Sequence, residues 1–150
     1  MGAYEVPNAE TITYEERQAF NRTVIAEFRA NAGQVSCLWE GATALLLTTT
    51  GAKSGKIRLT PLAYVTIDGA IIIVGSKSGS ESMPDWVFNL RANPHARIEI
   101  GTDAYDVIAR ELPLDERAVT YPKVAAAASV FGEYEAKTRR VIPLFELQRA

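Results

Sequence analysis

Hydrophobic residues recur at helical spacing in the first fifth of the chain. Phe20, Val24 and Phe28 are four residues apart, which puts them on one face of an α-helix. Thr13-Tyr14-Glu15-Glu16 precedes them as a capping box, in which the hydroxyl and the glutamate satisfy free backbone N–H groups. The pattern predicts an amphipathic helix over residues 13–33, lying on the protein's own sheet or, alternatively, on a membrane surface.

From residue 42 the pattern changes to short apolar and β-branched runs bounded by turn residues, which is typical of β-strands. We expect strands at residues 44–50, 57–67, 70–76, 96–100, 104–112 and about 141–147. Asp68-Gly69 joins two of them, and this two-residue connection favours a type I′ hairpin turn. Pro61 lies inside a strand and cannot donate to its ladder, so we expect an edge position or a bulge there.

Helical segments are expected between and after these strands. Ser82-Met83-Pro84-Asp85 is typical of a helix start and leads into residues 86–92, and a longer helical region covers 113–130, interrupted near Pro122. Most strands follow one another as hairpins, and hairpins pair antiparallel. The order of elements therefore predicts an α+β fold, a small antiparallel β-barrel with peripheral helices, rather than a doubly wound parallel sheet.

Composition restricts the classes of function. The chain has 150 residues, 47% of them hydrophobic, and a mean hydropathy of -0.03, which predicts one soluble domain over residues 1–150. With 16 basic and 18 acidic side chains the net charge is -2, which argues against a bulk-basic nucleic-acid-binding protein. Cys37 and His95 are the only residues of their types, so we expect no intramolecular disulfide and no metal site. An enzyme of this composition takes its chemistry from a cofactor.

We expect the chain to have neither a signal peptide nor a membrane-spanning segment. Its first residues are not a basic segment followed by an apolar one, and the apolar run 70–74 is far shorter than the roughly 20 residues that span a bilayer. We expect a cytoplasmic protein, a monomer or a homodimer, with peripheral contact to the inner face of the membrane through the N-terminal helix as an option.

A basic turn between two predicted strands carries the first functional signal. Residues 48–58 hold two glycines, several hydroxyls and the cations Lys53, Lys56 and Arg58. Glycines let backbone N–H groups converge on an anion, and a guanidinium can grip a phosphate with two hydrogen bonds. The turn is not a Walker A loop, because three residues separate its glycines and Ile57 stands where a hydroxyl is required. A solvated loop is the alternative interpretation.

Further motifs follow this turn in a fixed order. They are Pro61, Ser76-Lys77-Ser78-Gly79, residues 84–94 with the pattern PxWxxNLxANP, and Tyr134 with the T-x-R-x-IP ending at 138–143. Together with the basic turn they resemble the deazaflavin-dependent nitroreductase family. These are split-barrel oxidoreductases, related in fold to FMN-binding split barrels, that use coenzyme F420. The resemblance covers roughly residues 40–147.

The resemblance implies the cofactor and its contacts. Coenzyme F420 is a polyanion with a phosphodiester, an oligoglutamate tail and an apolar deazaflavin ring, and FMN is the less favoured flavin. The implied cofactor-binding residues are Ala52, Lys53, Ser54, Arg58, Thr60, Pro61, Leu62, Ala63, Val74, Gly75, Ser76, Lys77, Trp86 and Asn89. Ala52 replaces an arginine that is usual in the family, and Lys56 is the residue expected to compensate.

The resemblance also implies hydride transfer from the reduced deazaflavin to a small-molecule acceptor. Ser76 and Tyr134 are the implied catalytic donors, and Phe131 and Tyr134 are expected to cover the acceptor. Relatives that reduce nitroimidazoles line this pocket with several tyrosines, whereas Ala63, Ala128 and Phe131 stand at the equivalent positions here. This predicts an apolar acceptor, such as a quinone or an enone, with nitroaromatics reduced weakly.

Three alternatives stay open at this point. The barrel could use FMN, or it could bind a deazaflavin or a lipid without catalysis. The basic cluster Lys137–Arg140 is either a solvated face or a supplement to anion binding. A titration with both cofactors distinguishes the first two.

Overall fold

The computed structural model describes residues 12–36 and 43–150, so Cys37 lies outside the described residues. The helices are α1 (Tyr14–Ala30), α2 (Asp85–Ala92), α3 (Leu114–Ala127) and α4 (Ser129–Lys137), with a 3₁₀ turn η1 (Lys77–Gly79). The strands are β1 (Thr43–Thr50), β2 (Ile57–Ile67), β3 (Ala70–Val74), β4 (His95–Ile100), β5 (Asp103–Glu111) and β6 (Leu144–Arg149).

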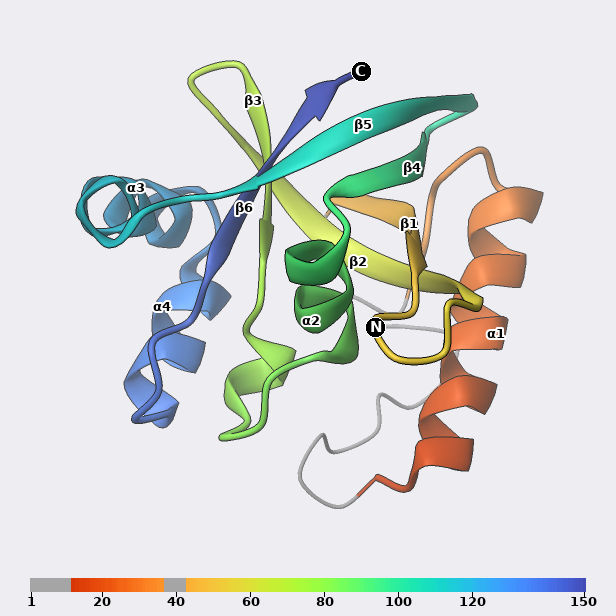
Figure 1. Cartoon of the computed structure of the whole chain (residues 1–150), viewed down its shortest axis with the longest axis horizontal. Coiled ribbons are helices and arrows are strands. Elements are labelled where there is room, and N and C mark those ends of the chain that lie inside the picture. Colours follow the sequence, from red (N-terminus) through yellow and green to blue (C-terminus); the bar gives the residue numbers. More distant parts are fainter. Residues whose placement is uncertain (1–11, 37–42) are drawn as a thin grey trace.

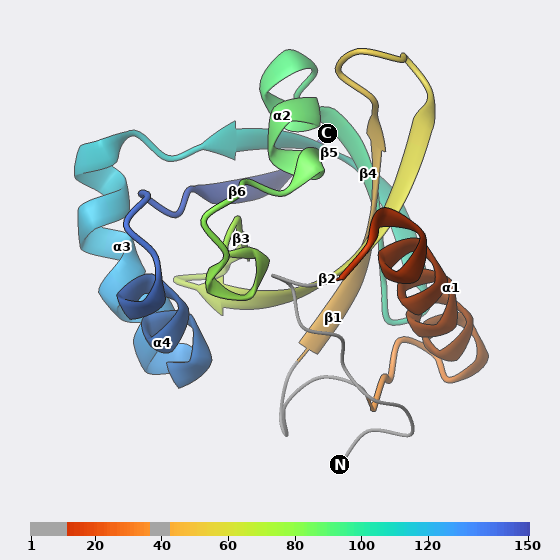
Figure 2. The same cartoon turned by 90° about the horizontal axis from the view of Figure 1, so that it is seen from below.

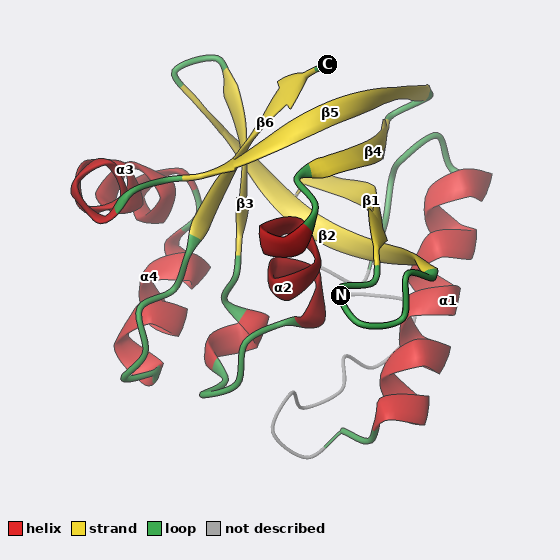
Figure 3. Cartoon of the chain, viewed as in Figure 1, coloured by secondary structure: helices red, strands yellow, loops and turns green. Residues whose placement is uncertain are grey.

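Within the described residues, the strands close into an antiparallel barrel in the order β1-β2-β3-β6-β5-β4 (Figure 3). The barrel and its peripheral helices confirm the predicted α+β split-barrel class. Asp68 and Gly69 have φ of 50° and 83°, as expected for the two central residues of a type I′ turn. Figures 1 and 2 place α1 and the α3–α4 pair on opposite sides of the barrel.

Two strands differ from the prediction at their ends by more than one residue. β3 stops at Val74, two residues early, because Ser76 already enters the η1 turn. β6 begins at Leu144, three residues late, directly after Pro143, which has no N–H to donate to a ladder.

The predicted break in the long helical region was placed wrongly. α3 continues through Pro122 and the chain changes direction at Ala128, whose φ of -148° and ψ of 101° are extended. The Tyr121 hydroxyl donates to the Phe131 carbonyl over 2.8 Å, which ties α4 back against α3. A tertiary contact, and not the proline, therefore accompanies the turn between the two helices.

Strand β2 has one paired and one unpaired edge over its first half. It pairs with β1 from Ile57 to Tyr64, but with β3 only from Tyr64 to Ile67. Pro61 lies opposite Leu46 of β1, in the stretch that β3 does not cover. The expected edge position of Pro61 is confirmed, and the barrel is split along this edge.

The C-terminal half of α1 is anchored to the barrel. Phe28 is buried and packs with Ala44 and Leu46 of β1, which confirms that the apolar face of the helix lies on the sheet. Gly33 follows with a φ of +89°, and a Cβ there would lie 2.8 Å from the Gly101 Cα. Only glycine fits this close approach between the end of the helix and the β4–β5 turn.

The hydrophobic core occupies the barrel interior and extends under two helices. Inside the barrel, Leu45, Leu47 and Ile98 are fully buried, and Phe145 packs edge-on against Trp86 of α2. A second buried cluster joins the β3–β6 side of the barrel to α3 and α4. None of the helices in the described ranges has the length and apolar character to cross a membrane.

Candidate active site

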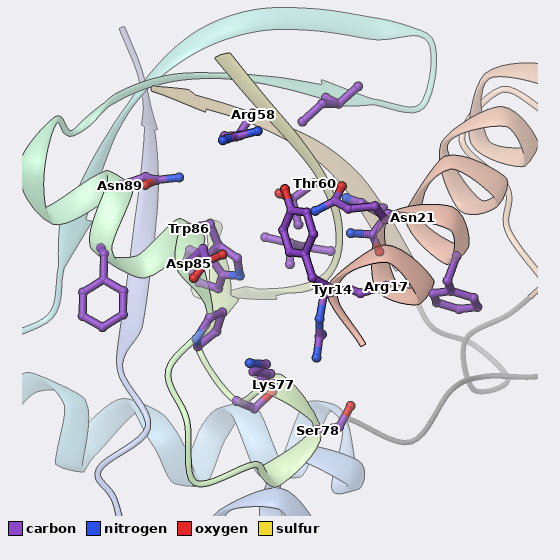
Figure 4. Close-up of a pocket in the computed structure, with 18 of the residues that line it drawn as sticks. Tyr14, Arg17, Asn21, Arg58, Thr60, Lys77, Ser78, Asp85, Trp86 and Asn89 are labelled. Atoms are coloured by element: carbon purple, nitrogen blue, oxygen red, sulfur yellow. The ribbon is translucent and has the colours of Figure 1, made fainter. Parts of the chain in front are cut away.

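A cavity of about 1020 Å³ opens where the barrel is split, between α1 and α2 (Figure 4). Its walls come from α1, the β1–β2 turn, the unpaired edge of β2, the loop after β3, α2 and α4. The volume is at the upper end of the roughly 300–1,000 Å³ range of small-molecule and cofactor pockets. The site therefore has room for an elongated ligand.

The β1–β2 turn is held in place by Asn89 of α2. The Asn89 side chain is buried, its Oδ1 accepts from the Ala52 N–H over 2.9 Å, and its Nδ2 donates to Thr49 Oγ1 over 3.1 Å. Asn89 lines the cavity, so it belongs to the site by position. Its main role in the structure is to fix the start of the basic turn.

Most of the backbone N–H groups expected to form an anion-binding nest donate hydrogen bonds within the protein. The Gly51 N–H donates to the Lys56 carbonyl, the Gly55 N–H to the Gly51 carbonyl, and the Lys56 N–H to Ser54 Oγ. Ala52 donates to Asn89. These amides are not available to a ligand, so the turn offers an anion its side chains instead.

Positive charge dominates the cavity wall. Among the described residues, the lining includes four cations, Arg17, Lys53, Arg58 and Lys77, and one carboxylate, Asp85. Arg58 is paired across the ladder with Thr49, and directly paired residues share a face of the sheet. Arg58 accordingly projects on the side where Asn89 lies (Figure 4). The wall is electrostatically suited to a polyanion.

Apolar surface lies between these cations. Pro61 and Leu62 contribute the unpaired edge of β2, and Val74 the end of β3. Trp86 is only 4% exposed, so its indole is both a core residue and part of the cavity wall. A flat apolar ring with an anionic extension, as in a deazaflavin cofactor, fits this combination of walls.

Two aromatic residues of α4 close the cavity on another side. Phe131 and Tyr134 both line it, and their rings meet edge-on with centroids 6.1 Å apart. This confirms that the two residues share a face of the helix. The Tyr121 hydroxyl supports them through the Phe131 carbonyl, and burial raises the pKa of Tyr121 to about 12.

The contribution of α1 to the cavity was not predicted from the sequence. Tyr14, Arg17, Gln18 and Asn21 line the cavity (Figure 4). Their spacing of three, four and seven residues is one helical face, so a polar stripe beside the apolar one was the available signal. Tyr134 is therefore not the only tyrosine of the pocket.

Most predicted site residues meet at this one cavity. They are Ala52, Lys53, Ser54, Arg58, Thr60, Pro61, Leu62, Ala63, Val74, Ser76, Lys77, Trp86, Asn89, Phe131 and Tyr134. The lining residues that were not predicted are Ile12, Tyr14, Arg17, Gln18, Phe20, Asn21, Gly51, Ile57, Leu59, Ser78, Pro84, Asp85, Phe88 and Val130.

Three predicted positions lie outside the cavity wall. A Cβ at Gly75 would be 2.7 Å from Pro143 Cγ and 3.1 Å from Val87 Cγ2, so this glycine serves packing behind the cavity. Ala128 is the connection between α3 and α4 and does not line the cavity. Lys56 is exposed and is not among the residues that line the cavity.

Comparison with known proteins agrees with this geometry. Residues 20–148 match the family described as F420H(2)-dependent quinone reductase. An F420H(2)-dependent quinone reductase of Mycobacterium tuberculosis strain H37Rv is 34% identical over 130 residues, covering 83% of this chain and 86% of that protein.

Two solved structures are also similar. An F420-H2 dependent reductase, FDR-A, is 40% identical with a TM-score of 0.62, over 70% of this chain and 93% of its own. A structure described as a domain-swapped dimer is 36% identical with a TM-score of 0.64, over 87% of this chain and 98% of its own. The match spans most of the chain, including the basic turn, the strand edge and the α2 and α4 walls. The chain belongs to the F420H(2)-dependent quinone reductase family.

Proposed function

We propose that the protein is an F420H2-dependent oxidoreductase that transfers a hydride to an apolar acceptor, such as a quinone or an enone. The observation that carries the proposal is one cavity that combines a cationic rim with flat apolar walls. Membership of the F420H(2)-dependent quinone reductase family supports the same cofactor. When bound, the reduced deazaflavin supplies the hydride.

Residues of the chain itself bind the anionic part and the ring of the cofactor. Lys53 and Arg58 bind the anionic part of the cofactor by charge-assisted hydrogen bonds. Pro61, Leu62 and Trp86 provide the apolar surface against which its ring packs, and this exclusion of water strengthens the polar contacts nearby.

Stabilisation of the acceptor falls to neutral donors. The Ser76 and Tyr134 hydroxyls are two groups of the wall suited to donate to an oxygen that gains negative charge as the hydride arrives. Phe131 packs against the Tyr134 ring and gives this side of the pocket its apolar character. Ala63 and Phe131 add no hydroxyl to the wall, which favours a quinone or an enone over a nitroimidazole.

The test is a cofactor titration followed by steady-state turnover. We expect tight binding of F420, weak or no binding of FMN, and oxidation of F420H2 that depends on a menaquinone analogue. F420 binding without any acceptor-dependent oxidation would indicate a deazaflavin-binding protein instead, and FMN-dependent turnover would indicate the FMN alternative. Equal turnover of a nitroimidazole and the menaquinone analogue would contradict the proposed preference.

Membrane contact belongs to the same proposal. Tyr14, Ile57 and Phe88 are 60%, 69% and 49% exposed, and all three lie at the cavity. Large apolar side chains around a pocket mouth are suited to accept a lipid-soluble molecule from a bilayer surface. We propose a cytoplasmic protein, as expected from the sequence, with peripheral access to the membrane through these side chains. Co-sedimentation with anionic vesicles, compared between the wild type and I57E, tests this placement.

A further inference from the structure

The loop between β3 and α2 enters an unfavourable backbone conformation beside the cavity. Lys77, Ser78 and Gly79 are consecutive residues with φ of 46°, 55° and 81°. Left-handed backbone is disfavoured for residues with a Cβ and is maintained only where the surroundings impose it. Lys77 and Ser78 line the cavity (Figure 4), so the strained run is part of the site.

One guanidinium bonds the chain on both sides of this run. Arg140 Nη2 donates to the Ser76 carbonyl and Arg140 Nε donates to the Ser80 carbonyl, each over 2.9 Å. Arg140 Nη1 is also directed at Met83 Sδ, at 3.4 Å. Because the guanidinium is a rigid planar fork, its contacts fix the separation of the two carbonyls that flank residues 77–79.

The residues next to Arg140 bind the same loop from outside. The Glu81 carboxylate accepts from Thr138 Oγ1 and from the Arg139 N–H, each over 3.0 Å. These hydrogen bonds lower the pKa of Glu81, the backbone bond from Arg139 contributing most. Lys137 Nζ lies 3.4 Å from the Ser78 carbonyl. Within the basic cluster 137–140, the Lys137 and Arg140 side chains therefore contact backbone carbonyls of this loop, whereas the Arg139 side chain is exposed.

The inner side of the loop presents its polar groups to the site. The Lys77 ammonium donates to Ser82 Oγ over 2.9 Å, and Ser80 Oγ is 3.0 Å from the same hydroxyl. Ser76, Lys77 and Ser78 all reach the cavity wall from this short segment. Their placement relative to a bound ligand depends on how the loop is held.

We propose that Arg140 is a positioning residue whose guanidinium, by bridging the Ser76 and Ser80 carbonyls, holds the left-handed Lys77–Gly79 turn in the conformation that binds the cofactor. Arg140 does not line the cavity. It acts through the loop, and a half-buried charge with three loop partners is costly to replace. The inference rests on the proposed function only for the identity of the ligand.

The experiment compares R140Q with R139Q, which removes the same charge from the exposed neighbouring side chain. We expect R140Q to weaken F420 binding about 10-fold or more, as the loss of a charge-assisted hydrogen-bond network implies. We expect less than about 2-fold for R139Q, because the exposed Arg139 guanidinium acts on the loop only through its charge near Glu81. Equal F420 affinity of the two variants at a temperature where both are folded would overturn the proposal. If R140Q does not fold, R140K replaces it in the comparison with R139Q, because lysine keeps the charge but cannot bridge both carbonyls.

A double-variant cycle separates positioning from a general loss of stability. Glycine tolerates a φ of 55°, so S78G relieves part of the strain that Arg140 holds in place. We expect the affinity loss caused by R140Q to be smaller in the S78G background than in the wild type. If R140Q causes the same fold loss of F420 affinity in the S78G background as in the wild type, the two positions are not coupled, which would contradict the proposed role.

Hydrogen exchange of the cofactor-free protein gives a readout that does not need F420. We expect faster exchange in residues 76–83 of R140Q than of R139Q, with the barrel strands unchanged. If no variant and no wild type binds F420, the proposed function fails, while faster exchange in R140Q still supports the role of Arg140 in holding the loop. Identical exchange of this segment in both variants would overturn that role.

Discussion

The β1–β2 turn and the Ser76–Ser80 loop both bring cations to the same cavity, but they are held in different ways. Lys53 and Arg58 project from an exposed hairpin turn whose start is bonded to the buried Asn89. Lys77 is half-buried, its ammonium is bonded to Ser82, and the backbone around it is bracketed by Arg140.

The different ways in which the turn and the loop are held suggest different contributions to cofactor binding, affinity from the turn and orientation from the loop. Exposed cations on long side chains attract an anion from a distance, and salt weakens their effect. A half-buried cation on a braced loop is screened less and is pre-organised, so it contributes geometry as well as charge. We infer that the turn recruits the cofactor and the loop aligns it.

The largest expected effect is at the turn. Arg58→Ala removes a charge-assisted contact worth about 1.5–3 kcal/mol, so F420 affinity should fall roughly 10–150-fold. Lys56→Ala is the matched control, because Lys56 belongs to the same turn but not to the cavity wall. Fluorescence titration of F420 measures both. An unchanged dissociation constant in R58A would mean that Arg58 does not contact the anion.

The brace of the turn should matter nearly as much. Asn89→Ala leaves the Ala52 N–H and the Thr49 hydroxyl without their partner, which should cost about 1–3 kcal/mol of unfolding free energy. F420 affinity should fall with it, since the turn loses its anchor. Urea unfolding and F420 titration test this, with Asn93→Ala as a matched control outside the cavity wall. Equal F420 affinity in the two variants would mean that Asn89 does not hold the turn in its binding conformation.

A smaller effect is expected on the α4 side. Tyr121→Phe removes the hydrogen bond to the Phe131 carbonyl, worth about 1 kcal/mol of unfolding free energy. The folded-state pKa of Tyr121 is raised to about 12, so its stabilisation is complete below pH 10 and is lost as pH rises from 10 toward 12. Urea unfolding as a function of pH should show a shallower alkaline decline in Y121F. The same decline in both proteins would contradict this assignment.

The smallest effect sharpens the comparison of the two regions most directly. Lys53→Ala should weaken F420 binding by up to about 1 kcal/mol at low ionic strength, as is usual for an exposed charge. The loss should nearly vanish at 1 M salt, where the Debye length is about 3 Å. For Lys77→Ala, the loss of F420 affinity relative to the wild type should shrink much less at 1 M salt. Parallel salt dependence of the two variants would remove the distinction between recruitment and alignment.

Much of the site was predictable because its residues lie in local motifs. The basic turn, Pro61 and the PxWxxNLxANP helix each indicate the local backbone structure from neighbouring residues. All three contribute residues to the cavity. The errors arose where a distant partner decides the outcome. The Ala52 N–H donates to Asn89, 37 residues away, and Gly75 packs against Pro143 and Val87, and no pattern near either residue indicates these partners.

The sequence by itself determined the antiparallel hairpins, the capped helix α1 and the composition of the basic turn, because these depend on neighbours within a few residues. Only the tertiary structure decided which part of β2 leaves its edge unpaired, that the polar stripe of Tyr14 and Arg17 faces the cavity, and that Arg140 binds the Ser76–Ser80 loop. The reason is physical: strand register and side-chain partners such as Arg140 and Ser76, 64 residues apart, are set by how the barrel closes and packs, and no local pattern encodes that closure.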